Sequence, residues 1–251
     1  MWEADEGVPL PFLLPGTGSE LLFHYRVPFA AVDQHGGRYF PAKAHLFCLR
    51  TFSCRLVAQG AVGFVEVRFR SSAVRHFGCL RMGELVDRFL PASEHFGPEI
   101  EQLTGQLERC ANFRERAAVL EQWLLRILKT RQPELSSADR AVSAIYYGEP
   151  GETVADISDT LGFSNRQFER LVGEAAGLSP KKFQRLARLN HTMRQLLLSE
   201  NPHYLDTALS RGYYDQAHFI HELGAFSGKA PGELLTKESF MSHFYNHRLA
   251  R

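Results

Sequence analysis

The sequence has no hydrophobic run that approaches the roughly 18 residues a membrane-spanning helix needs. Its first residues, Met1 to Glu6, include acidic side chains where a secretory signal peptide would carry basic ones. We therefore expect a cytoplasmic protein with no membrane partner.

Cysteine is scarce and dispersed. The four cysteines, Cys48, Cys54, Cys79 and Cys110, form no CxxC pair and no ladder of short spacings. This argues against a zinc knuckle and a disulfide framework, and buried free thiols are the better interpretation. A DNA-alkylation repair enzyme, which would need a clustered cysteine zinc site with an activated thiolate, is also disfavoured. We find no catalytic constellation and do not expect an enzyme.

The chain also lacks an excess of charge. It has 29 Lys and Arg against 28 Asp and Glu, a formal net charge of +1. A strongly basic balance would be the usual electrostatic signature of a nucleic-acid-binding protein, so any case for DNA must rest on local pattern. The 44% hydrophobic and 23% charged content is typical of a globular protein, and 251 residues are enough for two domains with separate cores.

The first part of the chain is predicted to be rich in β-structure. Four segments contain many Val, Phe, Leu and Tyr residues and are separated by Gly and Pro: 20–26, 45–50, 54–58 and 62–69. In the last segment Val65, Val67 and Phe69 alternate with Glu66 and Arg68, which is the two-residue period of a half-buried strand. A small β-barrel or sandwich fits this pattern.

After Ser71 the apolar spacing becomes helical, first over 80–89. It continues in a longer stretch with one apolar face, formed by Phe113, Ala117, Leu120, Leu124 and Leu128. The segment 129–139 contains Pro133 and a pair of serines, which favour a break. We predict an α+β protein with a β-rich domain and helical appendage at 1–131 and an all-α domain at 136–251.

Histidines and aromatic residues of the first part could serve a ligand. His24, His35, His45 and His76 show no close spacing of the kind metal sites use, so surface or packed histidines are favoured over a metal site, and no metal or cofactor is expected. Five aromatic residues could line a pocket, but core packing is the favoured role for most of them: Phe23, Tyr25, Phe47, Phe64 and Phe69.

The second half contains an internal repeat, within 153–180 and again within 208–231. Each unit has a short amphipathic helix, a turn with Gly, an aromatic residue, a polar cap and a second helix. This order is typical of a helix-turn-helix. A generic helical bundle is the alternative, and two aligned units with matching ends make it the weaker one.

Helix signals in the first unit are specific. Thr153 with Asp156 predicts a capping box, and Gly162 suits the left-handed residue that ends a helix. Ser164 with Gln167 repeats the capping-box spacing and predicts the start of the second helix. That helix should bury three apolar side chains and turn three charged ones outward. The buried set is Phe168, Leu171 and Val172, and the outward set is Arg166, Glu169 and Arg170.

A long helix should join the two units. Ser179 and Pro180 are a cap and a first helical residue, and the helical pattern continues to about Ser199. At roughly 1.5 Å per residue this helix spans on the order of 28 Å, close to the roughly 34 Å of one DNA turn. It could set two recognition helices in successive major-groove segments.

The second half resembles the AraC/XylS family of bacterial regulators over about its last hundred residues. The resemblance rests on LGFS at 161–164, GLSPKKF at 177–183, RLARL at 185–189 and GYYDQAHF at 212–219. It implies that the second helix of each unit enters the major groove of double-stranded DNA. By their positions in the family's motifs, the residues expected to read bases are Arg166, Glu169, Arg170, Gln216, His218 and His221. Lys181 and Lys182 are expected to contact DNA phosphates. For His218, packing beside Phe219 is an equally weighted alternative.

In the family a basic or aromatic run usually follows the inner residue of the recognition helix. This sequence has VGE at 172–174 and LGA at 223–225 instead, and His221 stands where the family commonly has Arg. We expect weaker or more dimer-dependent DNA binding than in a typical member. The first part is similar to the cupin-like sensor domains of such regulators, which implies a small-molecule effector or a homodimer, and RNA polymerase as a further partner. The alternative function is an effector-binding or protein-interaction module with weakened DNA binding.

Overall fold

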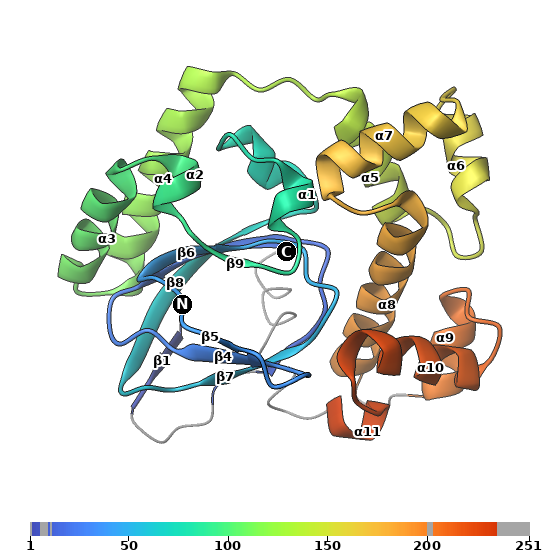
Figure 1. Ribbon diagram of the computed structural model, residues 1–251, viewed down its shortest axis with the longest axis horizontal. Coiled ribbons are helices and arrows are strands. Elements are labelled where there is room, and N and C mark those ends of the chain that lie inside the picture. The colour runs from blue at the N-terminus through green and yellow to red at the C-terminus, as the bar shows by residue number, and fades with distance from the viewer. Residues whose placement is uncertain (1, 6–9, 11, 200–202, 235–251) are drawn as a thin grey trace.

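The computed structural model describes residues 2–5, 10, 12–199 and 203–234. Two antiparallel sheets form the first half. The larger has the order β1 (Trp2–Ala4), β8 (Val62–Phe69), β3 (Ser19–His24), β6 (Ala44–Phe47), β9 (Phe89–Pro91). The smaller has the order β2 (Phe12–Leu13), β7 (Cys54–Val57), β4 (Ala30–Asp33), β5 (Arg38–Tyr39). The two sheets enclose a barrel-like core, as Figure 1 shows.

The four predicted strands are confirmed as β3, β6, β7 and β8. The strand predicted at 62–69 from its alternating residues has the same bounds in the structure. Along β8, Val65 and Phe69 are buried while Glu66 and Arg68 are partly exposed. The short strands β2, β4, β5 and β9 were not predicted, because two to four residues carry too little periodicity to show.

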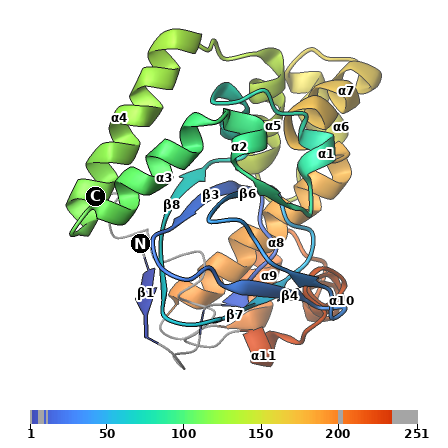
Figure 2. The same cartoon turned by 60° about the vertical axis from the view of Figure 1, so that its left-hand side comes forward.

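After β8 the described chain of the first half forms the α-helices α1 (Met82–Leu85), α2 (Ser93–Phe96), α3 (Glu99–Arg109) and α4 (Phe113–Arg131), with β9 between α1 and α2. In Figure 2, α3 and α4 lie together at one end of the larger sheet. The helix predicted over 80–89 is wrong beyond Leu85, because Phe89 starts β9 instead. There it pairs with Phe47 in the ladder, and their rings stack with centroids 3.7 Å apart.

The predicted apolar face of α4 is partly wrong. Phe113 is exposed, and the fully buried side chains of the helix are Arg116, Leu120 and Trp123. The guanidinium of Arg116 donates to the carbonyl oxygen of Leu107, in the last turn of α3, and to that of Cys110, the residue after the helix. The helix therefore uses a long polar side chain to satisfy carbonyls that would otherwise lack donors.

The second half is all-α, as predicted. Its helices are α5 (Ser137–Tyr147), α6 (Val154–Thr160), α7 (Asn165–Ala176), α8 (Pro180–Leu198), α9 (Tyr204–Ser210), α10 (Gln216–Ser227) and α11 (Pro231–Leu234). The long helix α8 runs between the group that contains α6 and α7 and the group that contains α9 and α10 (Figure 1). The rest of the domain predicted at 136–251, beyond Leu234, lies outside the described residues.

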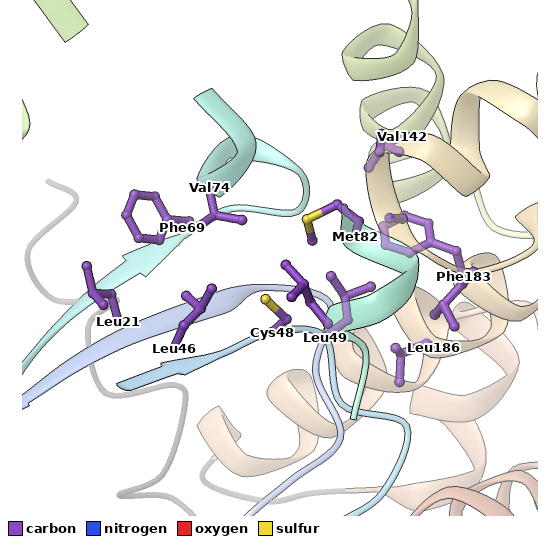
Figure 3. Close-up of a cluster of buried hydrophobic side chains, with 14 of the residues drawn as sticks. Leu21, Leu46, Cys48, Leu49, Phe69, Val74, Met82, Val142, Phe183 and Leu186 are labelled. Atoms are coloured by element: carbon purple, nitrogen blue, oxygen red, sulfur yellow. The ribbon is translucent and has the colours of Figure 1, made fainter. Parts of the chain in front are cut away.

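One hydrophobic cluster runs through both halves of the chain. Figure 3 shows Met82 of α1 close to Leu49 of the β-rich half and to Val142 and Phe183 of the helical half. All four side chains belong to the same buried cluster. The two halves thus share apolar surface that neither would cover alone. The boundary between 131 and 136 remains a prediction, and no regular element occupies 132–136.

Among the described residues, no helix is both long and apolar enough to span a bilayer.

Candidate DNA-binding interface

The first helix-turn-helix unit is α6, a turn and α7. The capping box at its start is formed: the Asp156 N–H donates to Thr153 Oγ1 at 3.2 Å, and the Thr153 N–H donates to the Asp156 carboxylate at 2.9 Å. Gly162 in the turn has φ +71°, which favours glycine. Ser164 then caps α7 by accepting from the Gln167 N–H. The predicted order of helix, turn and helix is therefore confirmed.

Helix α7 separates its side chains as the spacing predicted. Phe168, Leu171 and Val172 are buried, and the three candidate readers Arg166, Glu169 and Arg170 are exposed. The Arg170 guanidinium lies 2.7 Å from the carboxylate of Glu174, and both side chains are at least half exposed. An exposed pair of this kind contributes about 0–1 kcal/mol, so a phosphate or base could displace the carboxylate.

The second unit repeats the plan with α9, a turn and α10. Gly212 has φ +79°. Asp215 caps α10 by accepting from the His218 N–H at 2.7 Å. The three candidate readers of this unit are exposed on α10: Gln216, His218 and His221. His218 is not packed in the core: its ring lies against Tyr213, and its Nδ1 is 3.4 Å from the Tyr214 N–H.

Helix α8 joins the two units. It begins at Pro180 with Ser179 as its cap and ends before Ser199, in agreement with the predicted bounds. Lys181 and Lys182 lie exposed on its first turn. Lys181 lines a cavity between the two units, whereas Lys182 does not. The two phosphate candidates therefore have different surroundings.

An ionic network fixes α10 against α8, and the sequence reasoning assigned it no role. Glu222 is only 1% exposed. Its carboxylate accepts from Arg188 at 2.9 and 3.0 Å, from Arg185 Nε at 2.7 Å and from the Tyr213 hydroxyl at 2.8 Å. Arg188 also stacks over the Tyr213 ring at 4.3 Å. RLARL at 185–189 carried the family resemblance, but nothing in its spacing showed a partner on α10.

Tyr214 is a second residue that the sequence reasoning left without a role. It directly precedes the cap of α10 and is 88% exposed, the most exposed large apolar or aromatic side chain described. A phenol at this place could reach a phosphate or a base edge next to Gln216. Its neighbour Tyr213 is buried, and burial beside Glu222 raises the pKa of that phenol well above its usual range. The GYY motif thus combines an inward and an outward tyrosine.

Both recognition helices touch the β-rich half at their C-terminal ends. Gly177 ends α7 with φ +71°, and a Cβ there would come 2.5 Å from the carbonyl oxygen of Met82. Gly228 ends α10 in the same conformation beside Gln34, and Ser53 donates to the adjacent Ser227 carbonyl oxygen at 2.7 Å. The glycine that closes each repeat therefore also lets the two halves approach closely.

A polar contact joins the halves at α5. The Asp139 carboxylate accepts from Arg75 at 3.0 Å and lies 3.1 Å from His76 Nε2. It also takes part in the capping box of α5 with Ser136. Despite the cost of partial burial, hydrogen bonds from Ser136 and Arg75 hold the pKa of Asp139 well below its usual range.

Of the four histidines considered for a metal, His24 and His45 are brought together in the barrel. Their rings stack at 5.3 Å, with Phe29 and Phe64 around His24. Burial lowers the pKa of His24 to about 3 and that of His45 to about 4. His76 contacts Asp139 and His35 is exposed. In the described part of the chain, no three His, Cys, Asp or Glu side chains are grouped as metal ligands.

The predicted state of the cysteines is half right. Cys48 and Cys54 are buried, and burial raises the pKa of each thiol to about 12. Cys79 is exposed and Cys110 partly exposed, because both lie at loops beside helices rather than in the barrel. Four of the five aromatic residues considered for a pocket are buried, namely Phe23, Phe47, Phe64 and Phe69, and Tyr25 is partly exposed.

A family model described as a helix-turn-helix domain matches residues 139–237. The curated proteins give no significant match. Solved structures of ToxT from Vibrio cholerae have a similar fold: one is 12% identical, with 93% of this chain and 96% of that chain covered and a TM-score of 0.53. ToxT with a bound unsaturated fatty acid is 11% identical over 93% and 92% of the chains with a TM-score of 0.51. ToxT with (E)-4-(8-methylnaphthalen-1-yl)but-3-enoic acid is 13% identical over 93% and 96%, with a TM-score of 0.52.

Two capped units on one linking helix, with exposed polar faces on α7 and α10, define a double helix-turn-helix DNA-binding domain. Residues 139–237 match the helix-turn-helix family model, and the chain as a whole has a fold similar to that of ToxT.

Proposed function

We propose that this protein is a sequence-specific transcription regulator that binds duplex DNA through α7 and α10 and acts in the cytoplasm. The observation that carries the proposal is the repeated geometry. In each unit a side chain caps the recognition helix, apolar residues anchor one face, and the candidate readers lie exposed on the other. Arginine can form bidentate bonds to guanine O6 and N7, and glutamine to adenine N6 and N7. Arg166 and Gln216 are the residues we assign to these contacts.

The electrostatics favour moderate affinity. Glu169 and Glu174 lie on or beside the reading face of α7, and α10 offers histidines rather than arginines. Fewer cations near the phosphates mean fewer released counterions and a shallower salt dependence. A second copy of the chain on an adjacent site would raise the effective affinity about 100-fold or more. We therefore propose a homodimer on DNA, with RNA polymerase as the partner through which transcription changes.

The β-rich half is the proposed sensor. It contacts the C-terminal ends of both recognition helices, so a molecule bound to it could alter how they are held. The crystal structures of ToxT with an unsaturated fatty acid and with a naphthyl butenoic acid suggest apolar carboxylates as the first effector class to test. No catalytic role is proposed for either half.

The experiment is selection of genomic fragments by the full chain, followed by mobility-shift titrations at several salt concentrations. We expect a defined motif in the selected fragments and an affinity that falls as salt rises. Oleate would then be added as a probe, with the expectation that the affinity for the selected site changes. Fragments without a common motif, bound weakly and alike, would instead support the alternative of an interaction module with weakened DNA binding.

A further inference from the structure

A groove runs along α8 between the two helix-turn-helix units. It consists of two adjoining cavities of about 470 Å³ each, which share His191 and Arg211. All the described lining residues lie between 145 and 212, so the groove belongs entirely to the helical half. Its size is in the usual range for small-molecule sites, about 300–1,000 Å³. The groove is therefore distinct from any effector site in the barrel.

Two arginines converge in the outer cavity. Arg194 of α8 and Arg211 after α9 line it, together with His191, Gln195, Leu198 and Ser199. Neither arginine forms an ion pair with a carboxylate of the described residues. None of the described residues that line this outer cavity is acidic, whereas the inner cavity includes Glu149 and Glu152. Two like charges that face one cavity repel each other, and an anion between them would remove that repulsion. The cavity therefore has the charge of an anion site.

The side chains around the arginines are held in place. Arg211 Nε donates to Gln195 Oε1 at 2.8 Å, which leaves the outer nitrogens of the guanidinium for a ligand. His191 Nε2 lies 2.9 Å from the Tyr146 carbonyl oxygen, so this nitrogen carries the proton. Burial lowers the pKa of His191, the hydrogen bond to the Tyr146 carbonyl oxygen opposes this, and the charges of Arg211 and Arg194 lower the pKa further. The cationic groups are therefore the arginines.

The groove is also placed where the two units meet. A Cβ on Gly212 would come 2.9 Å from the Gly151 backbone nitrogen, and Gln184 donates to the Glu152 carbonyl oxygen at 2.8 Å. Arg211 ends α9 and directly precedes the turn that leads to α10. A ligand held by Arg194 and Arg211 would therefore tie the second unit to α8 and set the position of its recognition helix.

We propose that Arg194 and Arg211 form a binding site for a small oxyanion, the phosphate or carboxylate group of a free metabolite, and that its occupancy controls how the second recognition helix is held. The site is separate from the sensor function proposed for the barrel. A DNA backbone phosphate offers the same chemistry, so the test must separate the two sources.

The test uses the full chain and pyrophosphate as the probe, in the absence of DNA and at constant ionic strength. Calorimetric titration should show saturable binding to the unaltered protein. The double variant Arg194→Gln/Arg211→Gln should bind more than tenfold more weakly, because each arginine supplies a charge-assisted hydrogen bond. Arg140→Gln is the control for the loss of an arginine elsewhere, since the Arg140 side chain is exposed on α5 and donates to the Ser137 hydroxyl. The charge-preserving variant Arg194→Lys/Arg211→Lys should retain part of the affinity.

Two results would overturn the proposal. One is pyrophosphate binding that the glutamine variant leaves unchanged. The other is no pyrophosphate binding, together with a loss of DNA affinity that is equal for all sequences and a salt slope lowered by about two, because that pattern marks two contacts to DNA phosphates. The urea midpoint of each variant shows whether it is folded. Since the titration contains no DNA, its failure leaves the proposed regulator function untouched.

Discussion

Glu222 on the second recognition helix receives two hydrogen bonds from Arg188 on the linking helix, at 2.9 and 3.0 Å, and is almost fully buried. Arg185 adds a third contact to the same carboxylate at 2.7 Å. The direction in which α10 points is therefore fixed by an ionic contact as well as by apolar packing. In the first unit the corresponding anchoring of α7 is apolar, through Phe168, Leu171 and Val172.

We predict that Glu222→Gln strongly destabilises the helical half. The amide has nearly the same shape, but it removes the negative charge that Arg185 and Arg188 share. Because both guanidinium groups are partly exposed, water compensates them in part, and we expect a cost of about 1.5–3 kcal/mol. Urea unfolding of the full chain measures the change. Glu233→Gln is the control, because that carboxylate is exposed on α11. Equal midpoints for the two variants would show that the network contributes nothing to stability.

Arg166→Ala should lower discrimination between the selected site and a scrambled one. A lost bidentate base contact costs about 1–3 kcal/mol of specificity. Lys181→Ala and Lys182→Ala should weaken both sequences alike, because phosphate contacts carry no sequence information. Mobility-shift titrations on both duplexes provide the measurement. If Arg166→Ala weakens both sequences equally, α7 does not read bases at this position.

Glu174→Gln should increase DNA affinity. The carboxylate of Glu174 occupies the Arg170 guanidinium, and it places a negative charge beside the expected path of the phosphates. Because such an exposed pair contributes about 0.2–1 kcal/mol, the gain should reach at most about fivefold. Glu101→Gln on α3 is the control for the change in net charge. A loss of affinity in Glu174→Gln would mean that the pair positions Arg170 for DNA.

The local signals of the helical half were sufficient to predict α6, α7 and α8. Thr153, Ser164 and Ser179 each cap a helix as expected, and Gly162 takes the predicted left-handed conformation. Caps and αL glycines act through bonds within a few residues, so the sequence contains the whole interaction. The exposure of Arg166, Glu169 and Arg170 followed from the same helical periodicity. The other five candidates for DNA contact came from the family resemblance: Lys181, Lys182, Gln216, His218 and His221.

What the sequence could not show depends on partners distant in the chain. Glu222 appears as one more acidic residue until α8 brings Arg185 and Arg188 against it. Phe89 appears helical until Phe47 pairs with it in a sheet. The shared core at Met82 was likewise invisible, because a four-residue helix gives no periodicity and its contacts lie about 60 to 100 residues away.

Trypsin should cut the native chain after Arg131, where α4 ends and the exposed segment 132–135 begins. We expect the two fragments to remain associated, because Met82 and Val142 belong to one buried cluster and Arg75 pairs with Asp139 across the cut. Size-exclusion chromatography of the nicked protein measures this. Fragments that separate and keep their native circular dichroism would show that the halves are independent domains.

The last prediction concerns acid. Burial lowers the pKa of His24 to about 3 and that of His45 to about 4, against an ordinary value near 6.5 in the unfolded chain. Below pH 6.5 the unfolded state therefore takes up protons that the folded state does not, and the free energy of unfolding decreases as the pH falls. At pH 5 the loss should be about 2 kcal/mol for each histidine. Asp139 does not contribute in this window, because its lowered pKa keeps it ionised in the folded state and an ordinary Asp is also ionised at pH 5.

Urea unfolding at pH 7.5 and pH 5 measures the difference. His24→Phe, which fits the rings of Phe29 and Phe64 around it, should remove about 2 kcal/mol of the pH dependence and leave the part that belongs to His45 and His191, whereas His35→Gln at an exposed turn should leave all of it intact. A pH dependence that His24→Phe does not reduce would assign the acid sensitivity to other groups.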